Sequence, residues 1–220
     1  YCDGDDWWDD PLKLQTQVGL LESDPACGMC CTAATDFYQA TGERKPYPPE
    51  RYTDFGRLLL RTTVANCTTL ARRGLIARYY DEIRPELHPE WLTDDWPMWL
   101  WFAACSRIRF IDRPTAVHRR LPASVSHSAE YRQRIAFRDS LMGISLWFDE
   151  RYTGGRNRFR ILRERSAVAL WILSYHGPVR EYLVRWWRDL KATPRLLLCP
   201  EGAGLLVKKV LFRRRKTLRL

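Results

Sequence analysis

The sequence predicts an α/β region over residues 1–128, followed by an α-helical extension over residues 129–220. Short apolar segments of strand type alternate with helix-type periodicity in the first part, whereas only helix-type periodicity continues after it. Charge divides in a similar way. Residues 185–220 hold 11 Lys and Arg against two acidic residues, a net of +9, while the whole chain has a net charge of +10. A near-neutral body therefore carries a basic C-terminal tail.

The chain opens with ten residues that include five aspartates. Asp10 and Pro11 then predict the start of a helix, with Asp as the N-cap and Pro at the first helical position. Leu14, Val18 and Leu21 follow at i, i+4 and i+7. This spacing predicts that the three side chains form the buried apolar face of the helix.

The remaining elements of the α/β region follow from local composition. Turn residues predict loops over 40–53 and 124–128, and the mixed stretch 58–76 predicts a loop or short strand leading into a helix. We further expect a buried strand over 28–33, an aromatic helix over 96–105, and strands over 107–111 and 115–117. In the extension, helices are expected near 130–150, 159–175 and 178–191.

The seven cysteines are an odd number with irregular spacing, which favours reduced thiols in a cytoplasmic protein. Cys27 and Cys30 have CxxC spacing, but no second pair or His cluster accompanies them. Buried strand cysteines are therefore favoured over zinc or redox chemistry. No apolar run approaches the ~20 residues that cross a bilayer, so no spanning segment is expected in this stretch.

Asp3, Gly4 and Asp5 form an Asp-x-Asp arrangement in the acidic opening. Two carboxylates on a tight turn can bind one hard divalent cation, and such a cation can neutralise a departing diphosphate. The same aspartates also suit a solvated loop or a helix N-terminus. The spacing alone does not decide between these readings.

The run YCDGDDWWDDPLKLQTQV at the start of the chain resembles the segment that ends the nucleotide-binding half of family 2 glycosyltransferases. In that family a strand delivers the Asp-x-Asp pair, and a helix begins a few residues later. The resemblance implies that Asp3 lies near the nucleotide and shares the metal, that Asp5 holds the metal, and that Asp6 helps bind the donor.

The run WLTDDWPMWL, residues 91–100, resembles the acceptor-side motif of the same family. The attacking hydroxyl must lose a proton, and Asp95 matches the family's general base. Asp94 and Trp96 are expected to support the acceptor side. The alternative is an ordinary helix N-cap. Both readings are compatible, because a helix N-terminus favours an ionised Asp95.

Two further stretches resemble the same family. The first is residues 66–73, and the second is residues 114–127, which resembles the segment that closes the catalytic domain. His118 stands where the family usually has Tyr, which favours a structural role over a catalytic one. Arg119 is the candidate for a phosphate contact.

The resemblance covers residues 1–128 and implies a partial GT-A fold without its N-terminal βα units. It implies an inverting, Mn²⁺- or Mg²⁺-dependent transferase. The donor would be a nucleotide-diphosphate sugar and the acceptor a saccharide or lipid-linked hydroxyl, in cell-surface polysaccharide or glycolipid synthesis. Another metal-dependent enzyme of nucleotide phosphates, such as a nucleotidyltransferase, would need Asp3 and Asp5 but not Asp95.

Residues 129–220 match no motif, but apolar clusters alternate with basic residues in the tail. This pattern suits a helix on an anionic membrane, which would make the protein peripheral on the inner face of the plasma membrane. It equally suits a helix packed on the catalytic domain. A basic nucleic-acid-binding protein is the other alternative, and the neutral body disfavours it, so no nucleic-acid partner is expected.

Overall fold

The computed structural model describes residues 1–47, 53–61, 64–121 and 130–198, and it is a mixed α/β structure as expected. The strands are β1 (Trp7–Trp8), β2 (Cys27–Tyr38), β3 (Glu43–Pro46), β4 (Leu70–Ala71) and β5 (Arg107–Arg120). The α-helices are α1 (Lys13–Ser23), α2 (Phe55–Leu58), α3 (Arg73–Ile83), α4 (Asp95–Cys105), α5 (Tyr131–Thr153), α6 (Arg158–His176) and α7 (Val179–Ala192). Short 3-10 turns cover Asn66–Thr68, Pro85–Leu87 and Pro194–Leu198.

The five strands form one mixed sheet in the order β1-β5-β2-β3, with β4 paired to β2. Strand β5 runs parallel to β2 and antiparallel to β1. The long β2–β5 ladder is the centre of the sheet. It aligns Asp36 with His118 and Phe37 with Arg119, so side chains more than 80 residues apart meet at one end of the ladder.

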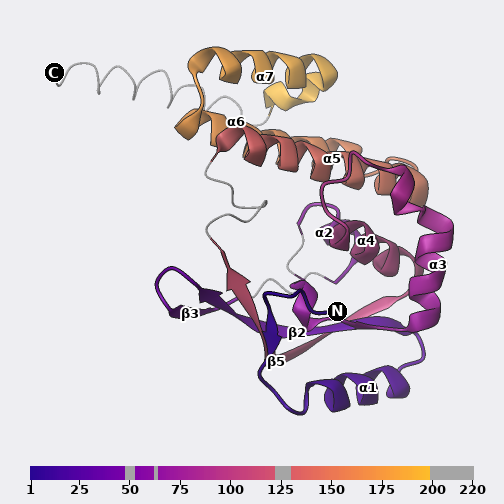
Figure 1. Ribbon diagram of the computed structural model, residues 1–220. Helices are drawn as coiled ribbons and strands as arrows, with labels where there is room; N and C mark the ends of the chain where they lie inside the picture. Colours follow the sequence, from indigo (N-terminus) through magenta and orange to yellow (C-terminus); the bar gives the residue numbers. More distant parts are fainter. Residues whose placement is uncertain (48–52, 62–63, 122–129, 199–220) are drawn as a thin grey trace.

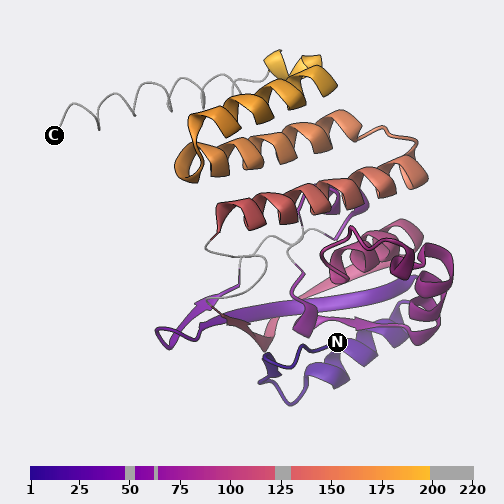
Figure 2. The same ribbon diagram turned by 45° about the horizontal axis from the view of Figure 1, so that its top comes forward.

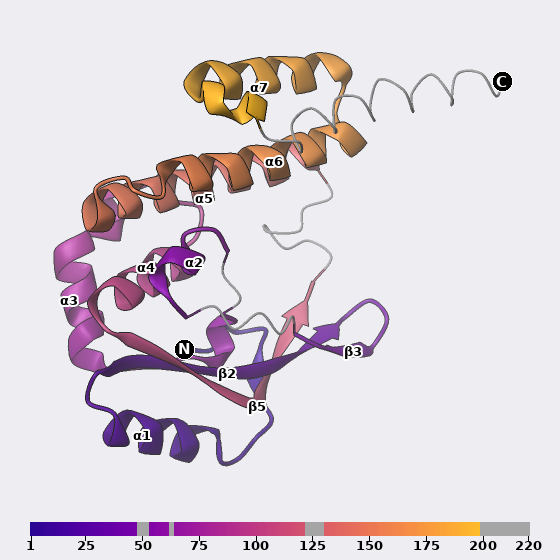
Figure 3. The same ribbon diagram turned by 180° about the vertical axis from the view of Figure 1, so that it is seen from behind.

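The helices lie in layers on the two sides of this sheet. Helix α1 covers one face, and α2 and α4 lie on the other (Figure 1). Figure 2 shows α5, α6 and α7 stacked one beyond another above these two helices. The same order is visible from behind, with the N-terminus close to the sheet (Figure 3). The helical extension therefore continues the layered packing of the α/β region.

Helix α4 is the centre of the core. Pro97 is tolerated because it lies in the first turn, where its missing N–H removes no helical hydrogen bond. Every residue from Trp96 to Phe102 is buried, so this helix is apolar all round. Its cluster includes Leu141 and Phe148 of α5 and Ile161 of α6. One core thus joins the sheet to the first two helices of the extension.

The predicted apolar face of α1 is wrong at two of its three positions. Leu14 is 44% and Val18 42% exposed, and of the predicted set only Leu21 is buried. Lys13 and Gln17 share the buried face instead. Gln17 Nε2 donates to the Thr68 carbonyl at 2.8 Å, and Lys13 Nζ donates to Gln17 at 2.5 Å. Hydrogen bonds to the Thr68 carbonyl therefore let Lys13 and Gln17 occupy the buried face.

The start of α1 also differs from the prediction. The helix begins at Lys13 rather than at Pro11. The Asp10 carboxylate accepts the Leu12 N–H at 2.9 Å, so it still orders the turn before the helix.

Two strand predictions need correction. Residues 107–111 and 115–117 belong to one strand, β5, which continues through Pro114 because a register irregularity lies there. The predicted loop 40–53 contains β3, and residues 48–52 of it lie outside the described residues. The strand expected at 28–33 is confirmed and extends to Tyr38 as β2.

The three helices expected in the extension are confirmed as α5, α6 and α7. Helix α5 ends at Gly154, whose φ of +63° is the left-handed conformation that glycine adopts readily. The boundary predicted at residue 128, the loop 124–128 and the tail beyond 198 lie outside the described residues. Of the helices in the described part of the chain, none has the length and apolar character needed to cross a bilayer.

Candidate functional site

The acidic opening forms a turn that is fastened to the end of β5. The Asp6 N–H donates to the Asp3 carbonyl at 3.1 Å, which closes the turn. Strand β1 then pairs with β5. Arg119 of β5 donates its backbone N–H to Asp6 Oδ1 at 2.8 Å and its Nε–H to the Asp5 carbonyl at 2.7 Å. The two stretches that the resemblance assigns to the donor side therefore contact each other.

Asp3 and Asp5 are exposed, whereas Asp6 is half-buried. The Asn66 side-chain amide donates to Asp3 Oδ1 at 2.9 Å and so fixes its direction. Burial raises the pKa of Asp6, and the N–H of Arg119 partly opposes this effect. Asp6 is thus an anchor of the turn, and Asp3 and Asp5 are the carboxylates that a ligand can reach.

The guanidinium of Arg119 already contacts several neighbouring groups of the protein. Its Nη1 donates to Gln39, and its guanidinium lies 5.0 Å from the ring centroid of Trp7. The Asp5 carbonyl takes its Nε–H. Arg119 therefore orders the acidic turn. A phosphate contact remains a proposal for the rest of its guanidinium.

Asp95 begins α4 and is half-buried. Its Oδ1 accepts the Trp96 N–H at 2.6 Å and the Thr93 hydroxyl. Burial raises the pKa of Asp95, and those two hydrogen bonds oppose the rise. The charges of Asp94 and Asp3 raise this pKa as well. The hydrogen bond from the first turn of α4 therefore does not bring the pKa of Asp95 down to its usual value.

The effect of the Asp3 charge on the pKa of Asp95 indicates that the two acidic sequences lie near one another. Tyr1 supports this placement, because its ring meets the ring of Trp99 edge to face at 6.3 Å between centroids. The negative charge of Asp94 also raises the pKa of the Tyr1 phenol, after the larger effect of burial. The start of the chain therefore lies against the first turns of α4.

Asp94 and Trp96 have different surroundings. Asp94 is exposed at the N-cap position, and its carboxylate makes no cap hydrogen bond. Trp96 is only 2% exposed, and its indole N–H donates to the Leu58 carbonyl at 3.0 Å. Trp96 can thus support the acceptor side only by fixing the base of α4, since its ring lies in the core.

His118 belongs to a buried ionic group that the sequence did not suggest. Its Nδ1 lies 2.8 Å from Asp36 Oδ1, and Arg120 binds both oxygens of Asp36 at 2.8 and 3.0 Å. Burial raises the pKa of Asp36, but hydrogen bonds from His118 and Arg120 outweigh it and leave that pKa below its usual value. These contacts favour a structural role for His118.

Asn66 and Asp36 are the residues that sequence reasoning missed. Asn66 lies in residues 66–73, one of the stretches that resemble the family. Its hydrogen bond to Asp3 joins residues 63 positions apart. Asp36 becomes visible only through the parallel pairing of β2 and β5, which sets it opposite His118. A correct parallel register would have found Asp36.

A divalent cation fits the acidic turn if the protein supplies only two of its ligands. In the described ranges, no group of three or more His, Cys, Asp or Glu side chains gathers as a complete metal site. Magnesium, however, is often held by one or two carboxylates, with substrate phosphates and water supplying the other ligands. Asp3 and Asp5 match that donor set. Cys30 does not, because burial raises the pKa of its thiol to about 11.

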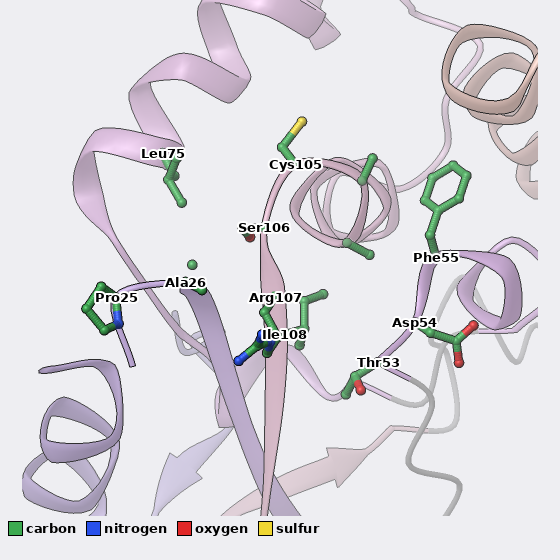
Figure 4. Close-up of a pocket in the computed structure, with 13 residues that line it drawn as sticks. Pro25, Ala26, Thr53, Asp54, Phe55, Leu75, Cys105, Ser106, Arg107 and Ile108 are labelled. Carbon is green, nitrogen blue, oxygen red and sulfur yellow. The ribbon is translucent and has the colours of Figure 1, made fainter. Parts of the chain in front are cut away.

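A cavity of about 810 Å³ lies elsewhere, between the start of β2, the end of α4 and the segment before α2 (Figure 4). Three of its polar side chains are already engaged. Asp54 accepts the Arg57 N–H at 3.0 Å, the Ser106 hydroxyl donates to Phe102, and Arg107 pairs with Asp24. This cavity contains none of the predicted site residues.

Comparison with known proteins gives relatives but no function. No family model and no solved structure matches the chain. Uncharacterized proteins of Mycobacterium bovis and Mycobacterium tuberculosis are 27% identical over 205 residues, which cover 90% of this chain and 56% of each relative. The chain thus spans little more than half the length of the relatives it matches.

Proposed function

We propose that this chain is part of a metal-dependent, inverting glycosyltransferase of the family 2, GT-A type. The observation that carries the proposal is the meeting of two acidic sequences about ninety positions apart. The Asp3–Asp6 turn and the start of α4 are close enough for Asp3 to raise the pKa of Asp95. Such a pair of acidic groups suits one reaction centre with a donor side and an acceptor side.

On the donor side, Asp3 and Asp5 would hold Mn²⁺ or Mg²⁺ together with the diphosphate of a nucleotide sugar. The cation supplies charge neutralisation for the departing diphosphate. Asp6 and Arg119 keep the turn in place by their mutual hydrogen bond of 2.8 Å. Asn66 sets the direction of Asp3. Preorganised groups of this kind lower the cost of reaching the transition state.

On the acceptor side, Asp95 would take the proton of the attacking hydroxyl at a carboxylate oxygen. A general base works best when its pKa approaches the working pH. The rise in the pKa of Asp95 that burial causes is in that direction. Attack from the side opposite the departing diphosphate would invert the anomeric carbon. Asp94 would support this side through its charge.

The acceptor is proposed to be a saccharide or a lipid-linked hydroxyl, in cell-surface polysaccharide or glycolipid synthesis. The mixed apolar and basic tail supports a peripheral location on the inner face of the plasma membrane. The mycobacterial relatives are longer than this chain. Full-length protein is therefore the right material for tests of activity.

The experiment that tests the proposal measures sugar transfer from nucleotide-diphosphate sugars with Mn²⁺ or Mg²⁺, in wild type and in Asp5→Asn. We expect Asp5→Asn to abolish metal-dependent turnover while the fold is kept, since Asp5 is exposed. Asp9→Asn is the matched control, because Asp9 is also exposed and lies 3.9 Å from Arg44 rather than on the turn. Unchanged metal dependence in folded Asp5→Asn would refute the assignment. Pyrophosphate release without sugar transfer would instead indicate a nucleotidyltransferase.

A further inference from the structure

A second cavity, of about 550 Å³, lies in the helical extension between α5 and α7. The apolar part of its lining includes Ile135 of α5, Leu173 of α6 and Val184 of α7. Ile135 and Leu173 belong to the packed cluster that joins the helices of the extension, so this part of the lining is fixed by the fold. Helix α7 is the outermost of the three stacked helices (Figure 2). One wall of the cavity is therefore the outer layer of the extension.

Four arginines and two acidic residues also line this cavity. Each of the two acids is already bound by an arginine. Arg132 donates to Glu181 at 2.7 Å. Arg185 donates to both oxygens of Asp139, at 2.7 and 2.8 Å. The two carboxylates of the lining therefore account for only two of its four cations.

The other two cations, Arg180 and Arg188 of α7, are exposed. No ion pair joins Arg180 to another described residue. Arg188 lies 3.9 Å from Asp139 and 3.7 Å from Asp189, which is too far for hydrogen bonds. Arg185 binds both of these carboxylates more closely. The N–H groups of Arg180 and Arg188 can therefore bind a ligand at the cavity.

Helix geometry brings these two arginines to the same side of α7. Arg180, Val184 and Arg188 are spaced at i, i+4 and i+8, so they form one row with Val184 in the middle. The helical rise puts the Cα atoms of Arg180 and Arg188 about 12 Å apart. Arginine side chains are long enough for both guanidinium groups to reach one anion beside Val184. The cavity thus combines an apolar wall with a pair of available cations.

The solvent-facing side of α7 around the cavity is apolar and basic. Leu183, Val184 and Trp187 are 44%, 62% and 54% exposed. The exposed charged residues of α7 are all basic, and Lys191 is the third of them. A second copy of this chain would bring the same positive charge to this face, whereas an anionic bilayer offers the opposite charge and an apolar interior. These surroundings favour a lipid over a protein as the occupant.

We propose that this cavity binds an anionic phospholipid. Its phosphate lies between Arg180 and Arg188, and the first carbons of its acyl chains lie against the apolar part of the lining. Guanidinium groups bind phosphate oxygens through charge-assisted hydrogen bonds, and the apolar side chains add contacts that a free phosphate ion lacks. The inference rests on the proposed location at a membrane and not on sugar transfer. One bound lipid is a weak anchor, so attachment to the bilayer remains the proposed role of the tail.

The test is binding of dihexanoyl phosphatidic acid, below its micelle concentration, to the full-length protein. Isothermal calorimetry is done in EDTA without nucleotide, so a failure here is distinct from a failure of sugar transfer. The proteins are wild type, Arg180→Met, Arg188→Met and Lys191→Met. Lys191 is the matched control, because it is an exposed cation of the same helix outside the lining of the cavity. We expect equal binding by wild type and Lys191→Met. Each arginine variant should bind about tenfold more weakly, as loss of one charge-assisted hydrogen bond predicts.

A fourth variant, Val184→Asp, should fold because Val184 is 62% exposed, and it should lose lipid binding because its carboxylate repels the phosphate. No binding by wild type, unchanged binding by both arginine variants, or an equal loss in Lys191→Met would overturn the site. Inorganic phosphate and dihexanoyl phosphatidylcholine, which has no net charge, should bind more weakly than the phosphatidic acid. Equal affinity for inorganic phosphate would identify a soluble phosphate as the ligand and overturn the lipid assignment. A lipid-free dimer that Val184→Asp dissociates in analytical ultracentrifugation would overturn it as well, because a second copy would then cover this face.

Discussion

Two buried arginines in the helical extension have opposite surroundings. Arg185 of α7 is 6% exposed and binds both oxygens of Asp139 at 2.7 and 2.8 Å and Asp189 at 2.8 Å. Burial lowers its pKa, but these bonds outweigh burial and raise the pKa above its usual value. Arg165 of α6 is equally buried, and its Nε and Nη2 atoms have no hydrogen-bond partner among the described residues. Within the described part of the chain, one buried cation is thus paired with two carboxylates, and the other is not.

The difference separates buried charges that described side chains neutralise from buried charges that they leave unbalanced. Two aspartates of the α/β region show the same contrast. Asp36 is satisfied by His118 and Arg120, and its pKa is lowered. Asp95 is half-buried near two like charges, and burial raises its pKa. Unbalanced charges cost stability, and such costs concentrate at functional sites.

The largest expected effect on stability comes from Arg185→Met. This change leaves the carboxylates of Asp139 and Asp189 without their cation, and breaking a buried pair in this way costs about 3–5 kcal/mol. Arg165→Met should be neutral or stabilising, because no hydrogen-bond partner of its Nε or Nη2 atoms is left behind among the described residues. Urea unfolding of the two variants, which differ from wild type by the same substitution, measures both. Equal destabilisation by Arg185→Met and Arg165→Met would contradict the contrast between a paired and an unpaired arginine.

A smaller loss is expected for Asp36→Asn, which removes the charge that His118 and Arg120 bind. Hydrogen bonds to a charged group contribute about 1.5–3 kcal/mol. The measurement is the free energy of unfolding at pH 7, with Asp9→Asn as an exposed control that should differ little from wild type. A stability equal to wild type would mean that Asp36 is not part of the structural framework.

The pH profile of Asp36 supplies an independent check. Its pKa is lowered in the folded protein, so its contribution is present above the unfolded value of about 3.9 and is lost as the pH falls through the folded pKa. Wild type should therefore lose more stability than Asp36→Asn as the pH falls below about 4. Parallel curves for the two proteins would show that the carboxylate is not held in its charged form.

The smallest effect per residue is expected for binding of the C-terminal tail to a membrane. Leu183, Val184 and Trp187 on α7 are exposed, and the sequence from Arg185 onward has a net charge of +9. Each basic residue near an anionic bilayer contributes about 1 kcal/mol. Co-sedimentation should require anionic vesicles, weaken with salt and disappear in a form that ends near Thr193. Equal binding by that form would assign the tail to packing.

Helix periodicity predicted most of the fold, and its failures have a physical cause. Helix-type periodicity predicts the three helices of the extension, and aromatic composition predicts α4. The buried face of α1 was missed because Lys13 and Gln17 pack inward through hydrogen bonds to Thr68, which only the tertiary structure provides. Periodicity measures apolar burial, so it misses faces that polar contacts bury.

Sequence motifs predict the parts of the candidate site whose residues are close together in the chain. The aspartates of the opening and of the α4 start are visible in the sequence. Asp36 and Asn66 were not found, because each meets its partner across more than 60 positions. The difference between Arg165 and Arg185 was equally hidden, since arginines alone do not show which carboxylates will reach them. Non-local contacts decide all of these cases.

The central claim is that Asp95 serves the acceptor and not the metal. The direct measurement combines the transfer rate of Asp95→Asn with its calorimetric affinity for a nucleotide diphosphate and Mn²⁺. The rate should fall by ~10²–10⁴-fold, as loss of a general base predicts. The affinity should equal that of wild type, whereas Asp3→Asn should bind nucleotide and metal more weakly. Loss of nucleotide–metal affinity in Asp95→Asn would contradict the account, because it would place Asp95 in the metal site.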